Sequence, residues 1–229
     1  RLYRNDGDGT FTDISVAAGI TGRRGTGLGI AVADFDGDDR PDVFIANDKM
    51  KDHLWLNRGD GRFEDVGLLW GVATNGQGLT TASMGVAARD FDADGDPDLI
   101  VGNLAKEPDS LFRNDGGGFS DVTNLTRLGP ISRPFTRFGL GWYDFDHDGF
   151  LDLYEANGRV MRQDRSVDEA DPYAEPNLVI RGTPDGRFAE VLPRGGTAAP
   201  LVATSRGAAF GDFDGDGAID VVVVNRDGP

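Results

Sequence analysis

Residues 34–42 read Asp-Phe-Asp-Gly-Asp-Asp-Arg-Pro-Asp, and the same nine-residue pattern returns at residues 90–98, 144–152 and 212–220. Aspartate holds the first, third, fifth and ninth positions of all four copies. Four carboxylates so close together repel one another and lose hydration when a loop closes. Calcium compensates for this, because it takes about six to eight oxygen ligands at about 2.3–2.6 Å in a flexible cage. The pattern therefore predicts an array of calcium loops.

Two other interpretations of the aspartate pattern are weaker. Aspartate and glycine are ordinary turn residues, but plain acidic turns do not require one spacing in four copies. The helical calcium-binding hand needs a glutamate at position twelve and amphipathic helices on both sides. Position twelve is occupied by Ile45, Val101, Glu155 and Val223, so only the third copy complies. The segments that flank the loops are short and β-rich, which excludes the helical calcium-binding hand.

The repeating unit extends beyond the nine-residue aspartate loop on both sides. A glycine stands five residues before each first aspartate, and an asparagine stands five residues after each last one. Between these marks lie short apolar runs such as Val43–Ala46, Leu99–Val101 and Val221–Val224. Runs of this length, rich in valine and isoleucine, are typical of β-strands. Each aspartate loop is therefore expected to join two strands of a hairpin.

A second hairpin alternates with the first, at residues 2–11, 54–63, 111–119 and 179–188. Its turns carry Asp-Gly or a related pair between apolar flanks, a strong hairpin signal. Two hairpins per unit and a regular period predict an all-β β-propeller with four-stranded blades. The expected units are a half-blade at 1–26, blades at about 27–81, 82–136 and 137–203, and a half-blade at 204–229.

The order of the hairpins leaves two arrangements open. The two terminal half-blades pair with each other and close a four-bladed ring, or they are the two ends of an arc. We expect the arc, from a ring of about seven blades, with further blades or domains in a longer parent chain.

These motifs resemble those of the FG-GAP/VCBS repeat family, which forms the propeller of integrin α-subunits. The phrases at residues 1–13 and 206–217, together with Glu155–Gly158 and Glu175–Leu178, resemble the cartilage acidic protein group and its bacterial relatives. The resemblance covers essentially the whole chain. It is specific for the fold and the metal, but such propellers serve many different functions.

By this resemblance, each loop binds one Ca²⁺, about four in all, through four carboxylates and the backbone carbonyl at position seven. The implied ligands are Asp34, Asp36, Asp38, Arg40 and Asp42; Asp90, Asp92, Asp94, Asp96 and Asp98; Asp144, Asp146, Asp148, Phe150 and Asp152; and Asp212, Asp214, Asp216, Ala218 and Asp220. Position six is glycine in three copies and Asp39 in the first, so Asp39 is expected to take a left-handed conformation.

The charge of the chain agrees with metal binding. The formal net charge is −16, and four calcium ions would halve it to −8. An acidic chain is a poor partner for nucleic acid. There is no cysteine, and no apolar run approaches the roughly 18 residues of a membrane span. Loops of this kind bind calcium in the range of extracellular modules, which predicts an extracellular, periplasmic or cell-surface location.

Catalytic motifs are missing from the sequence. His53 and His147 are isolated, and the Arg58-Gly59-Asp60 triplet falls in a repeated hairpin turn. The main irregularity is an insertion at residues 158–177, a position where binding specificity is often found. We therefore expect a non-catalytic adhesion or protein-interaction scaffold, with a protein or glycan ligand at a propeller face or at the insertion. The alternative is a carbohydrate-binding lectin or carbohydrate-processing module that uses a pocket on a propeller face.

Overall fold

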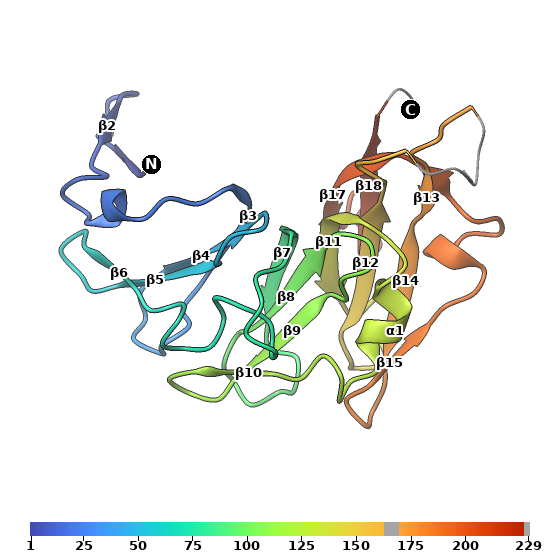
Figure 1. Ribbon diagram of the computed structural model, residues 1–229. Helices are drawn as coiled ribbons and strands as arrows, with labels where there is room; N and C mark the ends of the chain where they lie inside the picture. The colour runs from blue at the N-terminus through green and yellow to red at the C-terminus, as the bar shows by residue number, and fades with distance from the viewer. Residues whose placement is uncertain (163–169, 227–229) are drawn as a thin grey trace.

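Each aspartate loop connects the first two strands of an antiparallel sheet. The computed structural model describes residues 1–162 and 170–226, and it contains three four-stranded meanders (Figure 1). The first blade is β3 (Gly27–Ala33), β4 (Asp42–Asn47), β5 (His53–Asn57) and β6 (Phe63–Asp65). The second is β7 (Ser83–Arg89), β8 (Asp98–Asn103), β9 (Ser110–Asn114) and β10 (Phe119–Asp121). The third is β11 (Arg137–Tyr143), β12 (Asp152–Asn157), β14 (Leu178–Gly182) and β15 (Phe188–Glu190). The predicted all-β fold with four-stranded blades is confirmed.

Two further hairpins stand at the two ends of the chain. They are β1 (Tyr3–Asn5) with β2 (Phe11–Asp13), and β17 (Ser205–Gly211) with β18 (Asp220–Asn225). Each forms a separate two-stranded sheet, so the terminal hairpins do not pair with each other (Figure 1). The described chain is therefore an open arc of blades and not a closed four-bladed ring. The number of blades in a complete ring stays a prediction.

Only short elements lie outside the blades. β13 (Glu175–Pro176) pairs with β16 (Val202–Ala203), next to the start of the last hairpin. A single turn of α-helix, α1 (Leu128–Ser132), and two 3₁₀ turns, η1 (Ile20–Gly22) and η2 (Arg194–Gly196), complete the described residues. The insertion predicted at 158–177 leaves β12 at the end opposite the third aspartate loop, and its residues 163–169 lie outside the described part of the chain.

The first strands of consecutive blades, β3, β7, β11 and β17, lie side by side, and glycine permits their close approach (Figure 1). A Cβ atom on Gly29 would stand 2.2 Å from the carbonyl oxygen of Met84, and one on Gly85 would stand 2.4 Å from that of Phe138. No side chain fits at these distances. These glycines are two of the repeated glycines that precede the aspartate loops, so their repetition has a packing cause.

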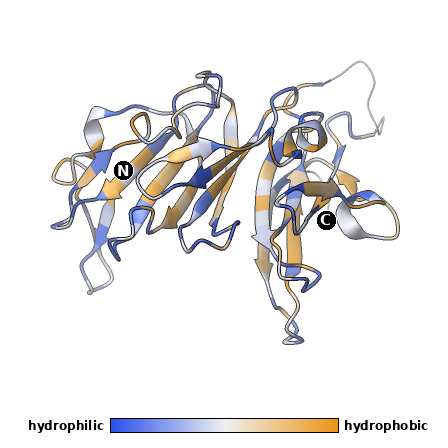
Figure 2. Ribbon diagram, turned by 90° about the horizontal axis from the view of Figure 1, so that it is seen from below, coloured by the Kyte–Doolittle hydropathy of each residue, from blue (hydrophilic) through white to orange (hydrophobic). Residues whose placement is uncertain are grey.

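The core consists of layers between neighbouring blades. Phe44, Leu56 and Val101 belong to a cluster between the first and second blades. Trp142 and Leu153 belong to a second cluster between the second and third blades. Figure 2 shows long apolar stretches along the strands of the blades. Because each sheet covers its faces with the next sheet, stability builds along the row of blades.

Candidate metal sites

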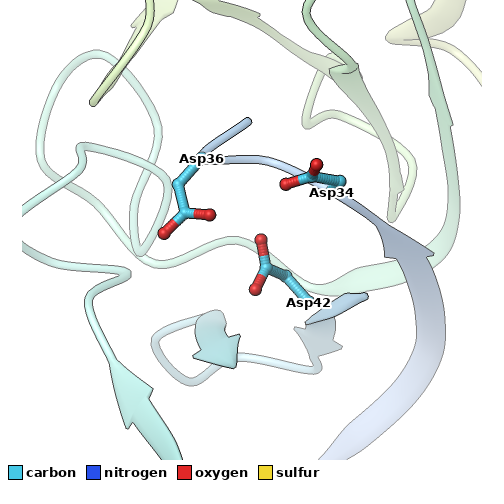
Figure 3. A group of neighbouring side chains, drawn as sticks. All are labelled: Asp34, Asp36 and Asp42. Carbon is cyan, nitrogen blue, oxygen red and sulfur yellow. The ribbon is translucent and has the colours of Figure 1, made fainter. Parts of the chain in front are cut away.

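The first aspartate loop brings three carboxylates together. Asp34 and Asp36 come from the loop after β3, and Asp42 is the first residue of β4 (Figure 3). One oxygen of each lies within 4.8 Å of the others. Figure 3 shows the three side chains pointing toward a common point. This is the spacing at which one cation can be shared by several oxygens.

The other loops repeat the arrangement. The first, third and ninth positions converge in the third and fourth loops, whereas the first, third and fifth positions converge in the second. The residues are Asp144, Asp146 and Asp152; Asp212, Asp214 and Asp220; and Asp90, Asp92 and Asp94. The remaining predicted ligands lie in the same loops, and the backbone N–H at position seven donates to the fifth-position carboxylate in every copy. Carbonyl ligation at position seven stays a prediction.

Backbone hydrogen bonds shape each loop around its carboxylates. In the first loop, Asp34 accepts the N–H groups of Asp38 and Asp39 at 3.1 and 2.7 Å. Asp42 accepts the N–H of Phe35 at 2.9 Å and that of Asn57, at the end of β5, at 2.7 Å. The ninth aspartate therefore ties the loop to the third strand of its blade, a role that the sequence did not reveal.

The electrostatics of the clusters fit a cation. Burial, followed by repulsion from Asp42 and Asp38, raises the pKa of Asp36, and its buried Oδ1 atom has no hydrogen-bond donor. Burial also raises the pKa of Asp98 to about 7, despite the N–H groups of Phe91 and Asn114 that favour its charged form. A divalent cation would relieve both the repulsion and the unpaired oxygen.

The loops contain two left-handed positions, and only one was predicted. Asp39 at position six has φ 64°, which confirms that prediction. Position four is also left-handed, with Ala93 at φ 62° and His147 at φ 59°. Glycine holds position four in the first and fourth loops, at Gly37 and Gly215, and this was the signal available in the sequence.

An arginine of the same blade reaches the second aspartate of each of the first three loops. The pairs are Arg58 with Asp36 at 3.1 Å, Arg113 with Asp92 at 4.0 Å, and Arg181 with Asp146 at 2.5 Å. These arginines stand on or just after the third strand of their blades. They offset part of the acidity of each loop. Arg58 belongs to the predicted turn, where Gly59 and Asp60 both have positive φ.

The fold and the repeated acidic loops are those of a repeat β-propeller. A family model described as "FG-GAP-like repeat" matches residues 1–45, 34–101 and 90–155. The chain belongs to this FG-GAP-like repeat family, and the predicted resemblance is confirmed.

Curated relatives with similar sequences are cartilage acidic proteins. Cartilage acidic protein 1 of Xenopus tropicalis is 31% identical over 224 residues, which cover 93% of this chain and 33% of that protein. The human protein of the same name is 32% identical over 175 residues, covering 72% of this chain and 25% of its own length. The chain thus spans about a third or less of the curated relatives it matches.

Two solved structures align with the chain at low TM-scores. An Agrocybe aegerita lectin, described as recognising non-reducing terminal N-acetylglucosamine, aligns with a TM-score of 0.43 and 21% identity, over 82% of this chain and 44% of that one. The Bacillus licheniformis rhamnogalacturonan lyase PL11 aligns with a TM-score of 0.44 and 15% identity, over 87% and 41%. No helix among the described residues is long and apolar enough to cross a membrane.

Proposed function

We propose that this chain is a calcium-stabilised, non-catalytic binding scaffold of an extracellular, periplasmic or cell-surface protein. The repeated convergence of three carboxylates in all four loops carries the proposal. Four equivalent copies support a structural metal, because an active site needs only one. Calcium loops of this type suit compartments where calcium is abundant, which is the basis for the proposed location.

The contribution of calcium to folding is expected to be large. A site gains about 2.7 kcal/mol when calcium stands at 100 times its dissociation constant. Four such sites together are comparable to the roughly 5–15 kcal/mol that stabilises an ordinary domain. Without metal, the clustered carboxylates repel one another. The melting temperature should therefore fall strongly in EDTA and recover with calcium more than with magnesium, which requires a stricter octahedron.

Titration calorimetry tests the individual sites. The parent chain should bind four calcium ions, and Asp92→Asn should bind three, because Asp92 belongs only to the second cluster. Asp60→Asn is the matched control, since Asp60 lies in the β5–β6 turn outside the clusters. An unchanged melting curve in EDTA, or four ions bound by Asp92→Asn, would contradict the metal proposal. Turnover of any substrate would contradict the non-catalytic role.

A second candidate function, saccharide binding, is favoured by one cleft. A cleft of about 280 Å³ lies between the second and third loops and is lined by Asp92, Phe150, Gly182 and other residues. Between the first and second blades, the amide of Asn114 donates to the carbonyl oxygen of Phe35 at 2.9 Å. Gly182 stands at the equivalent position of the third blade. Because it has no side chain, no such hydrogen bond connects the second and third blades there, and the cleft stays open.

The cleft combines features that suit a sugar ring. Phe150 offers a partly exposed aromatic face for an apolar sugar face, and the loop carboxylates accept hydroxyl hydrogen bonds. Binding to a panel of mono- and disaccharides tests this candidate. Phe150→Ala should abolish binding, whereas Phe213→Ala, at an exposed phenylalanine of the fourth loop, should not. Absence of saccharide binding by the calcium-loaded parent would remove this candidate and leave the scaffold proposal intact.

A further inference from the structure

A cluster of charged side chains is buried between the second and third blades, at the ends opposite the aspartate loops. Glu155 lies on β12, Arg137 begins β11, and Asp109 precedes β9; all three are 0% exposed. The other repeats carry apolar residues where Glu155 stands, namely Ile45, Val101 and Val223. They carry glycine or serine where Arg137 stands, at Gly27, Ser83 and Ser205. This interface therefore departs from the repeat.

The guanidinium of Arg137 is already engaged. Its Nε atom donates to Asp109, and Nη2 donates to the carbonyl oxygen of Glu107 at 2.8 Å. Its Nη1 atom donates to the carbonyl oxygens of Ser132, at 2.7 Å, and of Phe135. The single positive charge thus balances Asp109. If Glu155 were ionised as well, one negative charge would stay buried without compensation, which is strongly unfavourable.

The cluster also lacks hydrogen-bond donors for its carboxyl groups. Both carboxyl oxygens of Glu155 and the Oδ2 atom of Asp109 are buried and receive no donor. One proton on Glu155, donated to Asp109 Oδ2, would satisfy an oxygen of each residue and remove the excess charge. In addition, burial and the neighbouring Asp109 carboxyl raise the pKa of Glu155 well above its usual range.

The surrounding charged groups do not alter this balance. Glu190 on β15 adds repulsion and pairs with Arg194 at 2.5 Å. Glu175 on β13 pairs with Arg159 at 3.0 Å. Neither pair supplies a positive charge to Glu155, because each arginine has its own carboxylate.

We propose that Glu155 is a neutral carboxylic acid hydrogen-bonded to Asp109, so that the interface between the second and third blades holds a buried proton. A group whose folded pKa lies above its unfolded pKa binds more protons in the folded state. Its contribution to stability is present below the unfolded pKa and is lost as the pH rises through the folded pKa. The interface between the second and third blades therefore contributes more to the free energy of unfolding at low pH than at high pH.

Glu155→Gln tests the proposal, because glutamine keeps the size and can donate to Asp109 but cannot ionise. Melting curves are measured against pH in saturating calcium. Relative to Glu155→Gln, the melting temperature of the parent should fall by about 3–5 °C for each pH unit from about 4.5 up to the folded pKa. Glu64→Gln, at an exposed glutamate of β6, is the matched control and should keep the parent's pH profile.

Infrared spectroscopy reads the proton directly. At neutral pH, the spectrum of the folded parent minus that of Glu155→Gln should show the carbonyl band of a protonated carboxyl group. Asp52 and Asp98, whose pKa values are raised by burial to about 7, contribute equally to both spectra. Asp109→Asn should lose the Glu155 band too, because Arg137 would then be free to pair with an ionised Glu155. Parallel pH profiles of the parent and Glu155→Gln, or absence of the band from the difference spectrum, would overturn the proposal. If Glu155→Gln fails to fold, the difference spectrum of the parent and Asp109→Asn decides alone.

Discussion

Ala93 occupies an unusual backbone position for a residue with a side chain, in the second aspartate loop. Its φ of 62° lies in the left-handed region, where a side chain costs about 1–2 kcal/mol. The first and fourth loops avoid this cost with glycine, while Asp39 at position six relies on the tolerance of aspartate for this conformation. The hydrogen bonds within the loops therefore outweigh this local strain.

Ala93→Gly should stabilise the chain. Removal of the strain, less the backbone entropy cost of glycine, predicts a gain of about 0.5–1 kcal/mol, or about 1–4 °C in melting temperature. The control is Ala87→Gly in β7, where the same change should destabilise by about 0.5–1 kcal/mol. Equal effects of the two substitutions in thermal melts would show that the left-handed position carries no strain.

At the scale of the element, protons and the proposed calcium ion compete for the carboxylates of each aspartate loop. Burial raises the pKa of Asp98 to about 7 in the metal-free chain. This folded pKa exceeds the unfolded value of about 3.9, so its contribution to stability is lost as the pH rises toward about 7. Calcium binding requires deprotonated carboxylates and strengthens over the same range.

The two states should therefore show opposite pH dependence. In EDTA, the melting temperature should fall between about pH 5 and pH 8, and in saturating calcium it should rise. Asp98→Asn should make the EDTA profile less steep, and the remaining slope comes from the other buried carboxyl groups, Asp52 and Glu155. Profiles of the same sign in both conditions would contradict the assignment of these carboxylates as calcium ligands.

The close packing of the first strands of neighbouring blades requires glycine where these strands contact each other. Gly85→Ala would place a methyl group 2.4 Å from the carbonyl oxygen of Phe138, so β7 and β11 must separate. We expect a loss of about 1–3 kcal/mol, as for other overpacked sites. Gly207→Ala is the matched control, because nothing lies within 4 Å of that position in β17. Chemical denaturation of both variants of the 229-residue chain measures the difference.

At the scale of the whole molecule, the arc has two uncovered sheet faces. Leu28, Ile30 and Val32 of β3 are 59%, 67% and 60% exposed at one end. Val222 and Val224 of β18 are 51% and 61% exposed at the other. These residues correspond to those that pack between blades elsewhere in the chain. A contiguous apolar face of this kind favours association.

The 229-residue chain should therefore self-associate at rising concentration. Ile30→Lys should shift the equilibrium toward the monomer, because a charge cannot be buried against a neighbouring sheet. Leu69→Lys is the control, since Leu69 is 83% exposed outside the open faces. Sedimentation velocity over a range of concentrations measures the effect. A parent chain that stays monomeric throughout would show that the exposed strands do not associate.

The amino-acid sequence alone determined the repeat, the four loops and the four-stranded blades. Asp34–Asp42 and its copies act through contacts within nine residues, and the Asp-Gly hairpins act through contacts within ten, so spacing is enough to predict them. The left-handed conformation of Asp39 followed from the same local logic, because glycine holds that position in the other loops.

Tertiary structure decided what depends on residues that are distant in the sequence. The arginines that reach Asp36 and Asp146 come from other strands of the blade, 22 and 35 residues away. Glu155 satisfied position twelve of a helical calcium hand in the sequence, yet it points into the interface between blades, next to Asp109. Packing of one sheet on another brings these groups together, and no local spacing encodes that contact.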